Sequence, residues 1–136
     1  MLKIPKTVEY SLLALKFISE NSNDSSVSAK EISAKVDIPF DLLAKILQKL
    51  NKEGIIKSQQ GTKGGYVLNI SPDKISFSYL LSALEQKIQL TDCMTVKPTK
   101  EDCARVSNCC LRTPLGKIQI KIEELSNNTT IMELIK

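Results

Sequence analysis

Residues 28–54 read S-A-K-E-I-S-A-K-V-D-I-P-F-D-L-L-A-K-I-L-Q-K-L-N-K-E-G, two helix-like runs on either side of a proline. Pro39 cannot donate a hydrogen bond to a continuing helix and holds its predecessor in extended geometry. The sequence therefore predicts one short helix over about 29–36 and a second over about 40–53. Two short helices joined by a tight turn are typical of a helix-turn-helix, which we place at 28–54.

Both helices carry sequence signals at their ends. Ser28 and Glu31 have the spacing of a capping box, so the first helix is expected to begin directly after the serine. Gly54 suits the left-handed backbone geometry that commonly closes a helix. These signals predict where the first helix begins and where the second ends, which the helical periodicity alone does not define.

The second helix has an apolar and a polar face. The apolar face, formed by Leu43, Ile46, Leu47 and Leu50, is expected to be buried. Basic and amide side chains dominate the polar face, which carries Asp41, Lys45, Gln48 and Lys49. Such a face suits DNA, although these two helices alone fit an ordinary helical hairpin with a solvated face equally well.

A β-hairpin is expected over residues 55–69, directly after the second helix. Two strand-like runs at 55–58 and 66–69 flank a glycine-rich segment, and its glycines permit a tight turn with little bulk. A hairpin in this place is the wing of a winged helix-turn-helix, whose lysines meet phosphates and whose polar side chains reach base edges. The wing residues predicted to contact DNA are Gln59, Gln60, Thr62 and Lys63. A plain hairpin with surface lysines is the alternative.

The charge pattern favours a nucleic-acid partner. The net charge is +4, and five lysines against one acidic residue lie between Lys45 and Tyr66. With 136 residues, 42% hydrophobic and 25% charged, the chain suits one compact domain with an appended element. It has no apolar run long enough to span a bilayer and no apolar secretion signal, so we expect a cytoplasmic protein without a membrane partner.

The remaining segments give the predicted domain organisation. A helix over 8–19 and another from Ser76 to about Glu85 complete a DNA-binding domain over 1–86. Residues 87–112 form a cysteine-containing sensor loop. Residues 113–136 hold a long C-terminal dimerisation helix and a short terminal helix. The long helix, expected over about 114–126, carries a heptad-like seam of Leu115, Ile118, Ile122 and Leu125. That seam pairs two copies of the chain or, alternatively, packs on its own domain.

All four cysteines lie in the sensor loop, at Cys93, Cys103, Cys109 and Cys110. Their intervals are not the close pairs of a structural zinc site, and the chain has no histidine. Iron-sulfur clusters accept irregular thiolate spacings, whether [2Fe-2S] or [4Fe-4S]. Adjacent side chains point in different directions, so we expect three thiolate ligands, one of them from the adjacent pair, and a fourth ligand from elsewhere.

The order of these elements resembles the Rrf2 family of bacterial transcription regulators. The resemblance rests on K-T-V-E-Y-S-L-L-A-L, I-P-F-D-L-L-A-K-I-L-Q-K-L-N-K-E-G-I-I, the wing Q-G-T-K-G-G-Y and the later cysteine segment. It implies a mainly α-helical winged-helix homodimer with a small β-hairpin and, in some members, an iron-sulfur cluster. It also implies DNA contacts at Phe40, Asp41 and Lys45, and a fourth cluster ligand at Glu9 of the partner subunit.

The sequence thus predicts a dimeric regulator that binds double-stranded DNA at a palindromic operator and is controlled by an iron-sulfur cluster. One alternative is a cluster-free thiol switch on the same fold. Another is a small iron-sulfur electron carrier. An enzyme is not expected, because the chain offers no nucleophile-base constellation and no phosphate loop of the usual form.

Overall fold

Six helices and one β-hairpin follow one another in the computed structural model, which describes residues 2–21, 25–60 and 64–136. The elements are α1 (Lys6–Asn21), α2 (Ala29–Val36), α3 (Phe40–Lys52), β1 (Ile56–Gln59), β2 (Gly65–Leu68), α4 (Phe77–Ala83), α5 (Arg112–Asn128) and α6 (Ile131–Ile135), with a short 3₁₀ helix, η1 (Pro72–Lys74), before α4. The predicted fold class, mainly helical with a two-stranded hairpin, is confirmed. No helix within the described ranges is both long and apolar enough to cross a membrane.

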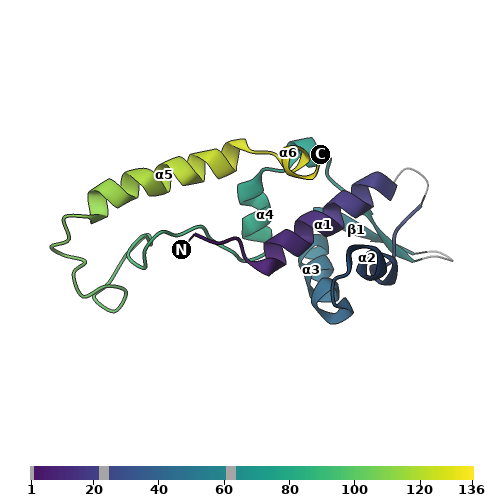
Figure 1. The fold of residues 1–136 in the computed structure, drawn as a ribbon, viewed down its shortest axis with the longest axis horizontal. Coiled ribbons are helices and arrows are strands. Elements are labelled where there is room, and N and C mark those ends of the chain that lie inside the picture. Colours follow the sequence, from purple (N-terminus) through teal and green to yellow (C-terminus); the bar gives the residue numbers. More distant parts are fainter. Residues whose placement is uncertain (1, 22–24, 61–63) are drawn as a thin grey trace.

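The molecule has a body and an arm (Figure 1). Helices α1 to α4, the hairpin and α6 form the body, whereas α5 extends away from it. The segment between α4 and α5, which contains the cysteines, runs out beside the arm and turns back at its far end. The cysteines therefore lie at the opposite end of the molecule from α2 and the hairpin.

The helix-turn-helix forms as predicted. The Ser28 hydroxyl accepts a hydrogen bond from the Glu31 amide at 3.2 Å, and the Glu31 carboxylate accepts one from the Ser28 amide at 3.1 Å. Both bonds of the capping box are therefore present. At the end of α3, Gly54 has a φ of 78°, the left-handed conformation expected of it. The apolar face of α3, formed by Leu43, Ile46, Leu47 and Leu50, lies in the core.

The C-terminal helix returns to the body. Thr130 and Glu133 form a capping box at the start of α6, as their spacing indicates. Ile131 and Ile135 are buried in the same core as α1 and α3. The predicted segment 113–136 thus contains most of the arm, α5, and an anchor, α6, that holds the C-terminal end of the arm against the body.

Several predicted boundaries were wrong by a few residues. Helix α1 begins at Lys6 rather than residue 8, because the Pro5 carbonyl already accepts the Val8 and Glu9 amides at 2.9 and 3.2 Å. Helix α5 begins at Arg112 rather than 114, since the Leu111 carbonyl accepts the Leu115 amide at 3.0 Å. It ends at Asn128 rather than 126, and α4 ends at Ala83 rather than 85. Both strands are shifted by about one residue from the predicted runs.

Candidate nucleic-acid interface and cysteine loop

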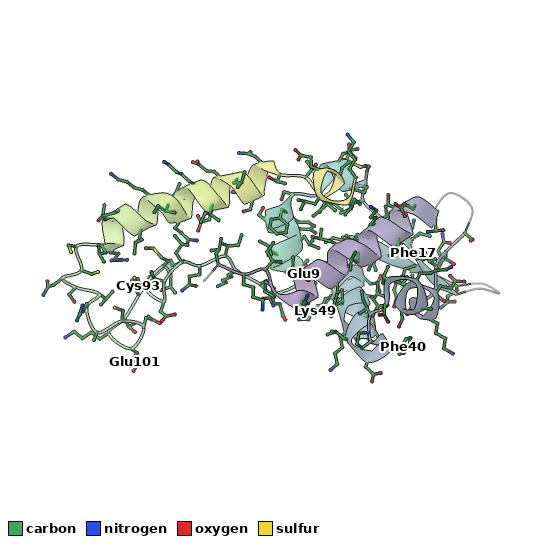
Figure 2. The ribbon with its side chains drawn as sticks, in the orientation of Figure 1. Glu9, Phe17, Phe40, Lys49, Cys93 and Glu101 are labelled. Atoms are coloured by element: carbon green, nitrogen blue, oxygen red, sulfur yellow. The ribbon has the colours of Figure 1, made fainter. Side chains whose placement is uncertain are left out.

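The outer face of α3 presents polar side chains to solvent. Asp41, Lys45 and Gln48 are exposed, and the Phe40 side chain at the start of the helix is 46% exposed (Figure 2). An amide and a cation can reach base edges and phosphates, and an exposed aromatic ring can contact a thymine methyl group. Because the opposite face of α3 is fixed in the core, these side chains are displayed on a rigid support.

Lys49 differs from the other predicted contacts on α3. Its ammonium lies 2.9 Å from a carboxylate oxygen of Glu85, just beyond the end of α4. The hydrogen bond and charge of Lys49 hold the pKa of Glu85 below its usual range. Sequence reasoning missed this pair because the two residues lie far apart in the chain and on separate elements.

The wing stands next to α3, and its strands pair in antiparallel register with Ile56 opposite Leu68 and Gln59 opposite Gly65. Gln59 and Gln60 are exposed, whereas the predicted contacts Thr62 and Lys63 lie outside the described residues.

A third stretch of backbone extends the hairpin at its open edge. The Val27 amide donates to the Tyr66 carbonyl at 3.0 Å, and the Tyr66 amide donates to the Val27 carbonyl at 2.7 Å. The segment before α2 is thereby tied to the wing. A single bridge of this kind gives no periodic pattern, so the sequence offered no signal for it.

Replacing Gly65 by alanine is expected to weaken this attachment. A β-carbon at Gly65 would lie 2.4 Å from the Val27 carbonyl oxygen, a backbone atom that cannot move without breaking the bridge. We expect the free energy of unfolding in urea to fall by about 1–3 kcal/mol, the usual cost of overpacking. Gly64→Ala is the control, because the nearest atom to its added carbon is 3.7 Å away. Equal stability of the two variants would contradict this account.

One side of α5 faces the body, and another side carries exposed apolar residues. Gln119 and Ser126 are each only 6% exposed, whereas the predicted seam residues Ile118 and Leu125 are 48% and 68% exposed. The other two seam residues, Leu115 and Ile122, are half-buried. Leu111, 59% exposed, extends the series 111, 115, 118, 122, 125 at spacings of four, three, four and three. Leu111 was absent from the predicted seam because the helix begins earlier than the sequence pattern indicates.

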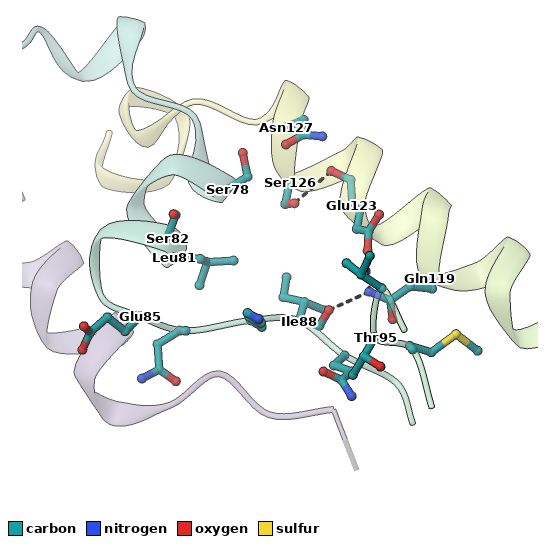
Figure 3. A pocket seen from close by; sticks show the side chains of 15 residues that line it. Ser78, Leu81, Ser82, Glu85, Ile88, Thr95, Gln119, Glu123, Ser126 and Asn127 are labelled. Atoms are coloured by element: carbon teal, nitrogen blue, oxygen red, sulfur yellow. Dashed lines mark hydrogen bonds between the residues drawn. The ribbon is translucent and has the colours of Figure 1, made fainter. Parts of the chain in front are cut away.

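Gln119 joins the arm to the segment that leads into the cysteine loop (Figure 3). Its amide nitrogen donates to the Ile88 carbonyl at 2.6 Å, and its amide oxygen accepts the Leu90 amide at 3.0 Å. These bonds run beside a cleft of about 690 Å³ between α4, α5 and this segment. The path of the chain between α4 and the cysteines is therefore fixed at residues 88–90.

The four cysteines sit in different surroundings. Cys93 is buried, and its sulfur lies 3.2 Å from the Thr91 hydroxyl. Cys103 and Cys109 are partly buried, and Cys110 is exposed. All four thiols are free. Within the loop, the Val96 side chain is 98% exposed, so this part of the loop is not packed on an apolar core.

The chemistry of the loop fits an iron-sulfur cluster, but its arrangement is not a preformed site. Four thiols supply the soft donors that such a cluster requires. Across the described ranges, no three His, Cys, Asp or Glu side chains are grouped closely enough to hold a metal ion. Binding of a cluster would therefore require the loop to bring its thiols together.

Glu9, the predicted fourth ligand, is placed apart from the thiols of its own chain. It lies on α1 in the body and is well separated from Cys93 in Figure 2. Its carboxylate forms an ion pair with Lys6 at 2.7 Å, and its side chain is 42% exposed. One chain does not bring Glu9 to the loop, so a ligand role requires a second copy.

Comparisons with known proteins agree with this architecture. The family profile described as Rrf2, iron-dependent transcriptional regulator, matches residues 4–136. The HTH-type transcriptional regulator IscR of Vibrio campbellii is 26% identical over 99% of this chain and 78% of its own length. Among solved structures, CymR, the global cysteine regulator of B. subtilis, has a TM-score of 0.72 at 23% identity, covering 99% and 97% of the two chains. T. potens IscR has a TM-score of 0.74 at 21% identity, covering 98% and 86%.

Proposed function

The chain belongs to the Rrf2 family of transcriptional regulators, and from this premise we propose that it acts as a homodimer whose operator affinity depends on its cysteine loop. Membership of this family makes it a DNA-binding regulator and not an enzyme. The observation that carries the proposal is the exposed polar face of α3, held rigidly beside a wing. The electron-carrier hypothesis is not retained, because the relatives are regulators.

The DNA contacts are assigned to α3 and the wing. We propose that Phe40, Asp41, Lys45 and Gln48 enter the major groove, where amide and basic side chains can distinguish base pairs. Gln59, Gln60, Thr62 and Lys63 of the wing contact the backbone or the adjacent groove. Lys49 belongs to the same face but is engaged by Glu85 in the free chain.

Dimerisation is assigned to the exposed series on α5. In the single chain, Leu111 is 59%, Ile118 48% and Leu125 68% exposed, and a partner helix would cover all three side chains. A heptad spacing is the pattern with which two helices pack along a common seam. Two copies joined in this way would present two α3 helices to two half-sites, so we propose a palindromic operator.

Control of operator affinity is assigned to an iron-sulfur cluster, [2Fe-2S] or [4Fe-4S], bound in the cysteine loop. Cys93, Cys103 and either Cys109 or Cys110 would hold it, with Glu9 of the partner subunit as the proposed fourth ligand. When bound, such a cluster supplies a response to iron and oxidants. Cys93 is the natural anchor of the set, since it is buried close to residues 88–90, which Gln119 fixes to α5.

A thiol switch without metal is the second candidate, and one observation favours it. The cysteines are free, and three of the four are at least partly exposed and so accessible to oxidants. Reversible disulfide formation would order the loop as ligand binding would, through the same residues. Iron and sulfide content of protein purified without oxygen separates the two.

Selection of binding sites from a random duplex pool tests the DNA-binding proposal. The enriched sequences should contain two inverted half-sites whose centres are about 10–10.5 base pairs, or a multiple, apart. Affinity for the selected duplex should fall steeply with added salt, because each neutralised phosphate releases counterions. Failure to enrich any sequence, together with salt-independent binding, would exclude the proposed function.

A further inference from the structure

Helix α4 ends in a strained conformation that its sequence does not favour. Glu85 has a φ of 57°, in the left-handed region that non-glycine residues seldom adopt. Its amide donates to the Ser82 carbonyl at 3.0 Å, and the Gln86 amide donates to the Leu81 carbonyl at 2.8 Å. This is the Schellman arrangement, in which glycine is the usual residue at the left-handed position.

Helix α3 closes in the same way with the usual residue. The Gly54 amide donates to the Asn51 carbonyl at 3.1 Å, and the Ile55 amide donates to the Leu50 carbonyl at 3.0 Å. Two neighbouring helices thus share one closing motif, with glycine in one and glutamate in the other. A non-glycine residue in a sparsely populated conformation motivates a hypothesis of function, which the contacts of its side chain have to carry.

The side chain of Glu85 binds a residue on α3, the helix proposed to contact DNA. Its carboxylate binds the Lys49 ammonium at 2.9 Å, and Lys49 lies one helical turn beyond Lys45. The Tyr79 hydroxyl, also on α4, donates to the Glu53 carbonyl at the end of α3 at 2.8 Å. Helix α4 and its end therefore contact the C-terminal half of α3 at two points.

We propose that Glu85 competes with DNA phosphate for Lys49 and so lowers the DNA affinity of the free protein. The inference rests on the proposed function, since it assumes that α3 binds DNA. A carboxylate and a phosphate oxygen offer the same ammonium equivalent charge-assisted hydrogen bonds. The pair is exposed, with side-chain exposures of 41% for Lys49 and 79% for Glu85, so it is weak enough for a phosphate to displace.

The position of Glu85 also links this competition to the cysteine loop. Glu85 is the first residue beyond α4 and its cap, three residues before Ile88, which Gln119 fixes to the arm. A rearrangement of the loop that moved α5 would carry residues 88–90 with it through Gln119 and would shift the Glu85 carboxylate. Within each chain, a change in the loop could therefore alter the DNA affinity of α3 without any change in the distance between the two α3 helices of a dimer.

Fluorescence anisotropy with a mixed-sequence 40-base-pair duplex, titrated at several potassium chloride concentrations, tests the proposal on the full chain. Glu85→Gln should bind about two- to fivefold more tightly than the wild type at low salt, the range expected for freeing an exposed pair. The gain should shrink as salt rises, because screening weakens the competing pair as well. In a Lys49→Gln background, Glu85→Gln should add nothing.

Glu53→Gln is the matched control, because it removes the same charge beside α3 from an exposed carboxylate. An unchanged affinity for Glu85→Gln, or the same gain with Lys49 already replaced, would overturn the inference. An equal gain for Glu53→Gln would do so too, since only net charge would then matter. If the wild type shows no salt-dependent DNA binding at all, the proposed function itself fails, which is a distinct result.

Discussion

Replacing Ile118 and Leu125 together by aspartate is expected to turn the protein into monomers and to weaken operator binding by about a hundredfold or more. Both side chains lie on the exposed side of α5, where Ile118 is 48% and Leu125 68% exposed. In the proposed dimer, burying the exposed part of each against a partner helix would contribute at most about 1.5–3 kcal/mol. Four such side chains are lost per dimer, and buried carboxylates are placed against one another instead.

The effect on DNA follows from the geometry of two linked binding sites. Once one α3 helix of a dimer is bound, the second half-site is met at a high effective concentration, which raises avidity by about 10²–10⁴. Monomers lose this gain even though each keeps its own α3 and wing. Sedimentation velocity and operator titration, performed on the same samples, measure the two consequences together.

Ile120→Asp is the control for this double variant. Ile120 is 55% exposed on the same helix but lies about 200° around the axis from Ile118. Ile120→Asp should leave both dimer formation and operator affinity unchanged. Monomers that still bind the operator as tightly as the wild type, or dissociation caused equally by Ile120→Asp, would contradict the assigned seam.

The sequence predicted the helix-turn-helix well because its signals are local. A capping box at Ser28 and Glu31, a helix-breaking proline and a glycine with positive φ act within a few residues of the boundaries that they set. Boundaries failed where the decisive group was a backbone carbonyl, as at Pro5 and Leu111, because a carbonyl is common to every residue and leaves no sequence pattern.

Features formed by distant parts of the chain could not be predicted. The Lys49–Glu85 pair joins residues 36 apart in sequence, and the Gln119 bonds to residues 88 and 90 span 31 and 29 residues. The return of α6 into the core likewise needs the tertiary fold. The cysteine pattern indicated the donor chemistry of the loop, but the spacing of thiols says nothing about whether they are already assembled, and here they are not.

A change in the cysteine loop is expected to alter operator affinity by about five- to 150-fold, the usual range of coupling between two sites. The physical reason lies in how the loop is tied. Cys93 is buried at one end of it, Gln119 fixes residues 88–90, and the other end runs directly into the seam of α5 at Leu111. Bringing the thiols together would therefore move the arm at Leu111. Through residues 88–90 it would also move the chain that follows Glu85.

Cys103→Ala is the variant that isolates this effect, with Ser107→Ala as its control. Cys103 is a proposed ligand whether Cys109 or Cys110 is the third thiolate, and Ser107 is an exposed residue of the same loop. In protein purified without oxygen, Cys103→Ala should abolish the iron and sulfide content and the visible absorbance. Ser107→Ala should leave all three unchanged.

The most direct measurement is operator affinity of wild-type protein purified without oxygen, determined before and after removal of its iron and compared with Cys103→Ala. We predict at least a fivefold difference between the iron-containing and iron-free wild type, and equal affinities for the iron-free wild type and Cys103→Ala. A wild type without iron or sulfide whose affinity instead changes on thiol oxidation would identify the thiol switch. Operator binding that is the same for all of these forms, reduced and oxidised, would contradict control through the cysteine loop.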